Sequence, residues 1–448
     1  MRTVISEAIL LCSLLLWGPV LPRAAAAAER EQTSPEGWQA GAPRDEIRPQ
    51  FFYESGGGPG GAPALVIASD YRPGLNGYWR KTFAVTGGAF YRFYALCKAE
   101  NMGAPRRSAV AEIVWQDDRG RTVPTDMGSV EAELPAQRGT GADGWTEVSD
   151  VNRSPERATR ALIDLRLRWA SEATVRWSKV SFSPTAPPPK RLVRLAAAHF
   201  RPEGGESVAD NLRMIEAVVE EAANQKADLL VLGELVTVHA IGGSTSPTET
   251  VPGPTTCRLG EMARKHDLYI VAGMPEREGH LIYNTAALIG PDGNLVGKYR
   301  KMVLTSGEAR EGTTPGGDYP VFETRFGKIG MMICYDLFFP EVSRQLAIRG
   351  AEIIALPIYG GDDALARARA MDNRVFLVTS TYMEPWTHWM RSGVWDREGN
   401  LIAAAKNWGT VAIAEVDLNE RFDHKWLGDF RNHVPRERPL WDVAQPPQ

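Results

Sequence analysis

The sequence predicts two structural parts, an all-β part followed by an α/β part in which strands and helices alternate. From about residue 50 to 184, apolar and polar side chains alternate with a period of two, whereas apolar runs separated by amphipathic segments follow from residue 192. Between them lies a proline-rich segment, residues 185–191, which cannot enter the middle of a sheet and is typical of a stiff linker. The chain, at 448 residues, is also too long for one ordinary core.

The composition restricts the classes of protein to consider. Hydrophobic residues make up 43% and charged residues 24%, which is typical of a globular protein and not of a disordered one. The net charge of −4 argues against a nucleic-acid binder that neutralises phosphates. Four cysteines are too few for a disulfide scaffold.

The first residues predict export. A short apolar run, residues 8–21, is followed by an alanine-rich stretch, and together residues 1–28 are interpreted as a cleavable signal peptide. The run is too short for an ordinary transmembrane helix. The alternative is an N-terminal anchor that is not cleaved. We therefore expect a periplasmic or extracellular protein.

Residues 50–184 are expected to form an antiparallel β-sandwich without helices. Ile163, Leu165 and Leu167 alternate with polar residues, and the alternation changes phase between Trp177 and Val180, as at a β-bulge. Residues 30–49 are interpreted as a loose lead-in, and the glycine-rich residues 54–63 as a flexible loop.

This pattern resembles the jelly-roll, carbohydrate-binding-type modules of secreted enzymes, which implies contact with a glycan or a surface as one role. Five tryptophans could stack on sugars, but large aromatic side chains are mostly found in cores, so we expect most of them between the sheets. They are Trp79, Trp115, Trp145, Trp169 and Trp177.

The second part, 192–448, alternates strands with helices. The expected strands are residues 192–198, 228–234, 268–272, 328–334, 352–357, 374–381 and 411–416, with a hairpin at 282–289 and 294–299. The expected helices are residues 207–223, 340–349 and 363–372. The order is typical of an α/β protein.

Three residues with useful chemistry stand at the ends of expected strands: Glu234, Lys301 and Cys334. Open α/β proteins bind ligands where strands end. Cys334 leads into a helical segment, so we expect an elbow that exposes the thiol beside a helix N-terminus and lowers its pKa. Glu234 could take the thiol proton, while Lys301 and the backbone amide of Tyr335 could stabilise an oxyanion.

Three segments carry a family resemblance, and they occur in the family's order. They are Leu229-Leu-Val-Leu-Gly-Glu234-Leu, Gly297-Lys-Tyr-Arg-Lys301-Met, and Gly327-Lys-Ile-Gly-Met-Met-Ile-Cys334-Tyr-Asp-Leu-Phe-Phe-Pro-Glu341. They resemble the glutamate, lysine and cysteine motifs of the carbon–nitrogen hydrolase (nitrilase) superfamily, and the resemblance covers about residues 192–420. Gly233 departs from the pattern, because the family commonly has proline there.

The resemblance implies a fold and a set of roles. The fold is a four-layer αββα sandwich, and members usually form homo-oligomers. Glu234 would be the general base, Lys301 the oxyanion stabiliser and Cys334 the nucleophile, with no cofactor. A second glutamate often lies between lysine and cysteine; Glu308 is the preferred candidate and Glu311 the alternative.

The expected function is an exported amidohydrolase that cleaves a small-molecule amide or carbamoyl substrate through a cysteine thioester. Alternatives are a carbamoyl-amine hydrolase, a nitrilase, or an inactive surface- or glycan-binding protein. Tyr359 and His388 could line the pocket, although packing is an equal interpretation. The scattered histidines and the lack of a ligand-spaced motif predict no metal site.

Overall fold

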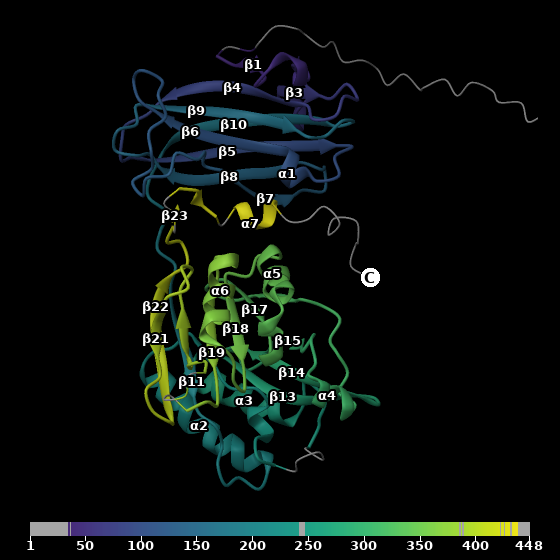
Figure 1. Ribbon diagram of the computed structural model, residues 1–448, viewed down its shortest axis with the longest axis vertical. Helices are drawn as coiled ribbons and strands as arrows, with labels where there is room; N and C mark the ends of the chain where they lie inside the picture. The colour runs from purple at the N-terminus through teal and green to yellow at the C-terminus, as the bar shows by residue number, and fades with distance from the viewer. Residues whose placement is uncertain are drawn as a thin grey trace, which may run out of the picture.

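The computed structural model describes residues 35, 37–241, 247–384, 387, 389–421, 423–424, 426–430 and 432–437. The predicted signal peptide, residues 1–28, lies outside this range. Figure 1 shows the N-terminal strands, in purple and blue, above the α/β part, in teal, green and yellow.

The N-terminal part consists of two antiparallel sheets. The four-stranded sheet has the order β1 (Gln39–Gly41), β4 (Asn76–Ala84), β9 (Arg160–Arg168), β6 (Ala109–Gln116). The six-stranded sheet has the order β2 (Gln50–Glu54), β3 (Ala64–Ala68), β10 (Thr174–Thr185), β5 (Phe90–Glu100), β8 (Thr146–Arg153), β7 (Ala136–Thr140). The predicted bulge is confirmed, because the register of β10 on β5 shifts between Ser178 and Ser181.

One hydrophobic core joins these two sheets. It contains inward-facing residues of both, among them Ile163 and Leu165 of β9 and Phe93 of β5. Three of the five tryptophans, Trp79, Trp115 and Trp177, lie in this core as expected, and Trp145 is buried outside it. Trp169 instead is 51% exposed and has the guanidinium groups of Arg107 and Arg168 over its ring.

Two details of this part differ from the prediction. Residues 39–41, inside the expected loose lead-in, form β1 and pair with β4. A one-turn helix, α1 (Pro105–Ser108), interrupts the all-β pattern with proline at its first turn. Both elements are too short to produce a periodic signal in the sequence.

The α/β part contains two six-stranded sheets. The first has the order β15 (Leu295–Arg300), β14 (Leu281–Ile289), β13 (Tyr269–Glu278), β12 (Leu229–Val231), β11 (Leu192–His199), β22 (Thr410–Asp417). The second has the order β16 (Val321–Glu323), β17 (Lys328–Met331), β18 (Ile353–Pro357), β19 (Phe376–Ser380), β20 (Gly393–Trp395), β21 (Leu401–Ala404). Within each sheet the central strands β11 to β13 and β17 to β19 run parallel.

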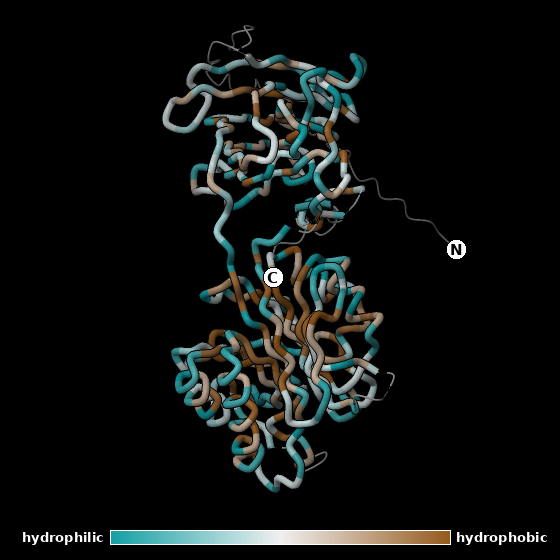
Figure 2. Tube along the Cα trace, turned by 90° about the vertical axis from the view of Figure 1, so that its left-hand side faces the viewer, coloured by the Kyte–Doolittle hydropathy of each residue, from teal (hydrophilic) through white to brown (hydrophobic). Residues whose placement is uncertain are grey.

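Side-chain alternation along the strands places helices on the outer faces. On β11, Ala196 and Ala198 pack with helices α2 (Val208–Asn224) and α3 (Pro254–His266), whereas Val193 and Leu195 face the second sheet. Helices α5 (Pro340–Ile348) and α6 (Asp363–Asn373) join the core of the second sheet. The layers are therefore helix, sheet, sheet, helix, and Figure 2 shows hydrophobic strands at the centre of this part.

The predicted helices at 207–223, 340–349 and 363–372 are confirmed, with ends within one residue. Helix α3 was not predicted, although Pro254 stands at its first turn. Strands β12 and β17 end at Val231 and Met331, three residues before Glu234 and Cys334. The chain leaves each sheet early and delivers both side chains from turns.

After β22, the chain returns to the N-terminal sheets, shown in yellow between the two parts in Figure 1. This segment carries β23 (Asp423–His424), β24 (Gly428–Asp429) and α7 (His433–Arg436). Arg421 Nη1 donates to Asn152 Oδ1 at 2.8 Å, and Asn432 Nδ2 donates to the Leu134 carbonyl oxygen at 2.8 Å. A cavity of about 1370 Å³ lies between the two parts and is lined by residues of both.

Candidate active site

Glu234 lies in the turn that follows β12. It is 8% exposed, and the hydroxyl of Tyr382 donates to its carbonyl oxygen. The preceding Gly233 makes room for this contact, because a Cβ there would lie 2.5 Å from the Tyr382 ring. The departure from the family's common proline thus coincides with an aromatic side chain packed against the turn.

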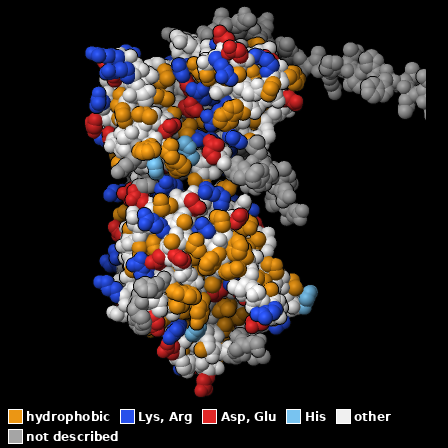
Figure 3. Space-filling view, viewed as in Figure 1, with side chains coloured by type: hydrophobic (Ala, Val, Ile, Leu, Met, Phe, Trp, Pro, Cys, Tyr) orange, Lys and Arg blue, Asp and Glu red, His pale blue; other side chains and the backbone are white. Residues whose placement is uncertain are grey.

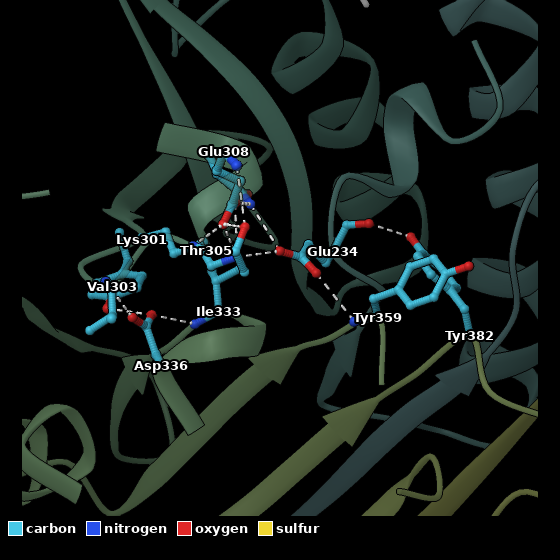
Figure 4. A network of polar contacts seen from close by, with 11 residues as sticks. Glu234, Lys301, Val303, Thr305, Glu308, Ile333, Asp336, Tyr359 and Tyr382 are labelled. Carbon is cyan, nitrogen blue, oxygen red and sulfur yellow. Dashed lines mark hydrogen bonds and ion pairs between the residues drawn. The ribbon is translucent and has the colours of Figure 1, made fainter. Parts of the chain in front are cut away.

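Lys301 follows β15 and is only 2% exposed. Its Nζ donates to Glu234 Oε1 at 2.9 Å and to Glu308 at 2.8 Å (Oε1) and 2.9 Å (Oε2). Lys298, three residues earlier, instead pairs with Glu276 on another part of the sheet. A buried ammonium group between two carboxylates is the electrostatic centre of the site, as Figure 4 shows.

Glu308 is held by the first turn of helix α4 (Ser306–Arg310). Thr305 caps this helix, and its N–H donates to Glu308 Oε2 at 2.8 Å in a capping box. Glu311, the alternative candidate, is exposed at the end of the same helix. The structure therefore brings Glu308 to Lys301.

Asn284 is a member of the site that the sequence analysis missed. From the middle of β14, its Nδ2 donates to Glu234 Oε1 and to Glu308 Oε1, both at 2.9 Å. It is 4% exposed, and the backbone N–H of Lys301 donates to its carbonyl oxygen at 2.9 Å. The signal available in the sequence was a polar Asn-Thr pair inside an apolar strand.

Cys334 stands at a sharp elbow between β17 and the 3-10 helix η5 (Cys334–Phe338). Its φ is +44°, a left-handed conformation that costs a residue with a side chain about 1 kcal/mol or more. The thiol faces the Glu234 carboxylate and the backbone N–H of Tyr359. The expected elbow is present and points the sulfur at the glutamate.

The expectation of a lowered thiol pKa is wrong. Burial, with the Glu234 carboxylate beside the sulfur, raises the pKa of Cys334 to about 12, although Lys301 opposes this. The helix that follows is a single 3-10 turn, so it contributes little dipole. The resting sulfur is consequently a protonated thiol that needs a base.

The charges around Lys301 stabilise its ammonium form. Burial alone would lower the pKa of Lys301, but Glu234, Cys334 and Glu308 raise it further than burial lowers it. Burial likewise raises the pKa of Glu308, and Lys301 with the donors around it lowers it to a net value below the ordinary one. Lys301 and Glu308 are therefore ionised at neutral pH.

Of the other three predicted site residues, the structure describes two, which differ in how they contact the reacting groups. Tyr359 contacts the site through its backbone, whose N–H donates to Glu234 Oε2 at 3.2 Å, and the residue as a whole is 54% exposed. Tyr335 directly follows Cys334, and its ring packs against Phe338 and Phe339. His388 lies outside the described residues.

A half-buried thiol, a carboxylate that faces it and an ammonium group beside that carboxylate can perform acyl transfer. Among the residues described, no group of three or more His, Cys, Asp or Glu side chains could hold a metal ion. No helix in the described ranges is long and apolar enough to cross a membrane. Over the face in Figure 3, cationic and anionic side chains are interspersed.

Comparison with known families identifies the α/β part. The family model described as carbon-nitrogen hydrolase matches residues 194–421. The chain belongs to the carbon–nitrogen hydrolase family. The matched residues include all three motifs, so this chain is an enzyme of the class that acts on C–N bonds other than peptide bonds.

Several curated relatives are similar to the same half of the chain. The omega-amidase NIT2 of Danio rerio is 33% identical over 248 residues, which is 51% of this chain and 87% of that protein. The omega-amidase NIT2 of Homo sapiens is 30% identical over 250 residues, which is 51% of this chain and 88% of that protein. A nitrilase of Pyrococcus abyssi is 37% identical over 201 residues, which is 42% of this chain and 74% of that protein.

Solved structures are similar over a comparable span. Nit3 of Saccharomyces cerevisiae, a nitrilase-superfamily member, has a TM-score of 0.45 at 25% identity, covering 52% of this chain and 93% of that one. An amidase variant from Nesterenkonia sp. AN1 in complex with acrylamide has a TM-score of 0.42 at 23% identity, covering 52% of this chain and 93% of that one.

Proposed function

We propose that this enzyme is an amidase that hydrolyses small-molecule amides through a thioester on Cys334, with Glu234 as base and Lys301 as oxyanion stabiliser. The observation that carries the proposal is the contact set of Glu234. Its carboxylate faces the Cys334 thiol and accepts a hydrogen bond from Lys301 at 2.9 Å. The nucleophile and the oxyanion stabiliser thus both contact the carboxylate that serves as the base.

In the first half of the reaction, Glu234 takes the thiol proton and the sulfur attacks the amide carbon. The oxyanion forms beside Lys301, whose Nζ can turn one N–H away from Glu308, since Glu308 accepts from it with both oxygens. The N–H of Tyr335 is the second donor in this proposal. The proton on Glu234 passes to the leaving nitrogen, the C–N bond breaks, and ammonia or an amine departs.

In the second half, water attacks the thioester and Glu234 takes its proton. The tetrahedral intermediate collapses, the C–S bond breaks, and the proton returns to the Cys334 sulfur. A raised thiol pKa suits this step, because the sulfur ends the cycle protonated and the base free. Glu308 supports both halves by fixing Lys301.

Among C–N bonds, we favour the amide. The first relatives described above are omega-amidases, so the monoamide of a dicarboxylic acid is the first substrate to try. Nitrile-cleaving members of the family tend to have tryptophan after the cysteine, where this chain has Tyr335. Carbamoyl amines are the second class.

The test is ammonia release from a panel of dicarboxylic monoamides, simple amides, carbamoyl amines and nitriles. Wild type and Cys334→Ala are assayed side by side, with Cys257→Ala as the matched control because Cys257 is an exposed free thiol. Release by wild type and Cys257→Ala, but not by Cys334→Ala, supports the proposal. Equal release by all three proteins, or by none on any substrate, contradicts it.

The proposal includes export and an accessory role for the N-terminal sheets. The signal-like residues 1–28 support export. The exposed Trp169 offers a surface aromatic group for contact with a glycan or another surface. N-terminal sequencing of the protein recovered from its native cells tests cleavage of this segment: a start near Glu29 supports it, and a start at Met1 contradicts it.

A further inference from the structure

Asp336 is a buried titratable group that the proposed reaction does not use. Its side chain is fully buried, two residues after Cys334. Its Oδ2 accepts from the Tyr299 hydroxyl at 2.7 Å and from the Ile333 N–H at 2.9 Å, and its Oδ1 accepts from the Val303 N–H at 2.8 Å. One carboxylate therefore joins three donors from two stretches of chain, residues 299–303 and Ile333.

These three donors flank the two reacting groups. Tyr299 and Val303 stand two residues on either side of Lys301, and Ile333 immediately precedes Cys334. The bond to Ile333 also closes the turn in which Cys334 has its φ of +44°. Figure 4 shows Asp336 between Val303 and Ile333, with dashed lines to both.

We propose that Asp336 is a positioning residue: its carboxylate anion fixes the Lys301 ammonium relative to the Cys334 thiol, and its protonation in mild acid loosens that arrangement and lowers turnover. This inference rests on the proposed function, since it assigns Lys301 and Cys334 their roles. It adds a group that touches neither substrate nor reacting atoms and that makes the site sensitive to pH.

The chemistry of protonation explains the loosening. The anion has only acceptor sites, and three donors occupy them. A neutral carboxyl must direct its own O–H somewhere, and the N–H groups of Ile333 and Val303 can only donate. The Tyr299 hydroxyl can reverse and accept, but the backbone N–H that donates to the protonated oxygen then has a neutral and weaker acceptor.

The electrostatic environment places this change in an accessible pH range. Burial raises the pKa of Asp336 to about 6, although the bonds from Ile333, Tyr299 and Val303 lower it. The groups that face it are Tyr299, Lys301 and Tyr319, whose pKa values are all raised, so they stay protonated there. From α6, the charged Arg369 donates to the neighbouring Leu337 carbonyl oxygen.

The same shift separates activity from stability. The ordinary value of an aspartate is 3.8, so between about pH 4 and 6 the folded protein holds a proton on Asp336 that the unfolded chain does not. Proton binding to the folded state favours folding. Through this group, acidification therefore lowers turnover without lowering the free energy of unfolding.

The experiment compares three variants over pH 4.5–8.5. For Asp336→Asn we expect kcat to fall about 100-fold with KM changed less than about threefold, and the kcat/KM step near pH 6 to disappear, while the melting temperature stays within a few degrees. Tyr299→Phe removes a bond that lowers the Asp336 pKa, so its step should move to higher pH. Asp164→Asn is the matched control, because Asp164 is a buried carboxylate that accepts from Arg80 and Arg166 in β4 and β9. It should lose stability and keep the wild-type pH profile.

A substrate-independent measurement separates this inference from the proposed function. A disulfide reagent that reacts in acid is applied, and labelling of Cys334 and of the exposed Cys257 is followed by peptide mass. The ratio of the two rates should change near pH 6 in wild type and not in Asp336→Asn, even if no panel amide is cleaved. An unchanged step in Asp336→Asn, in either measurement, overturns the proposal, as does an activity loss that merely matches its unfolded fraction.

Discussion

The side chains of the site differ in how far the sequence alone could place them. Glu234 and Cys334 end apolar runs, and Lys301 follows a strand of the predicted hairpin. Positions at strand ends predict a shared crevice, because open α/β proteins bind ligands there. Asn284 gives no such signal, since its contacts with Glu234 and Glu308 exist only once β14 lies beside both. The predicted direction of the shift in the Cys334 pKa was wrong for the same reason. The carboxylate beside the thiol and the groups that bury it come from distant segments of the chain.

Replacing each of the two candidate glutamates by glutamine tests which of them supports Lys301. Glu308→Gln removes a charge that accepts from Lys301, so we expect kcat/KM to fall about 100-fold, on the scale of losing one transition-state donor. Glu311→Gln is the matched control and should stay within about twofold, because Glu311 is exposed. An equal fall in kcat/KM in both variants would contradict a specific role for Glu308.

The pKa of Glu308 also predicts a dependence of stability on pH. Its folded pKa lies below the ordinary 4.5, so the stabilisation is present above that pH and is lost as the pH falls through the folded value. Thermal unfolding between pH 5 and 3 should show a steeper decline for wild type than for Glu308→Gln. Parallel curves would show that Glu308 is not coupled to Lys301.

At the scale of elements, long periodic segments were predictable and turns were not. Helices α2, α5 and α6 follow from apolar spacing and from caps such as Ser207, which accepts from the Asp210 N–H. The early ends of β12 and β17 depend on tertiary contacts. At the first of these turns the Tyr382 ring occupies the space that a side chain on residue 233 would need.

Gly233→Ala tests the geometry of that turn. The new Cβ would stand 2.5 Å from the Tyr382 ring, so the turn must shift and carry Glu234 with it. We expect kcat to fall at least about tenfold, with partial recovery in Gly233→Ala combined with Tyr382→Val. Gly317→Ala is the control, because its Cβ would meet nothing within 4 Å. Wild-type kinetics in Gly233→Ala would contradict this account of the turn.

At the scale of the whole molecule, alternation and the proline-rich segment predict two parts but not their contact. The C-terminal segment reaches back to the N-terminal sheets through Arg421, which donates to Asn152 and to Glu133 at 2.6 Å. Such a contact joins residues almost 300 positions apart, and no local pattern encodes it. Which tryptophans are buried, and that Trp169 is exposed, likewise depends on how the sheets pack.

Arg421→Ala tests this connection between the parts. It leaves the buried Glu133 and Asn152 with fewer hydrogen-bond donors, which should lower the free energy of unfolding by about 1–3 kcal/mol. It should also weaken the attachment of the C-terminal segment to the N-terminal sheets. We expect faster limited proteolysis within residues 185–191 and unchanged kcat. Arg213→Ala, which removes an ion pair with Asp210 on the surface of α2, should be cleaved by the protease at the wild-type rate. Equal rates in both variants would show that Arg421 does not hold the parts together.

The central claim is that Cys334 carries the acyl group while Glu234 activates it, and rapid acid quenching tests this most directly. Wild type is mixed with the best amide of the panel, quenched within milliseconds, digested and analysed by peptide mass. The account predicts the acyl mass on the Cys334 peptide, absent from Cys334→Ala and formed far more slowly in Glu234→Gln. Amide hydrolysis that proceeds at the wild-type rate in Cys334→Ala, or an acyl group found on another residue, would contradict it.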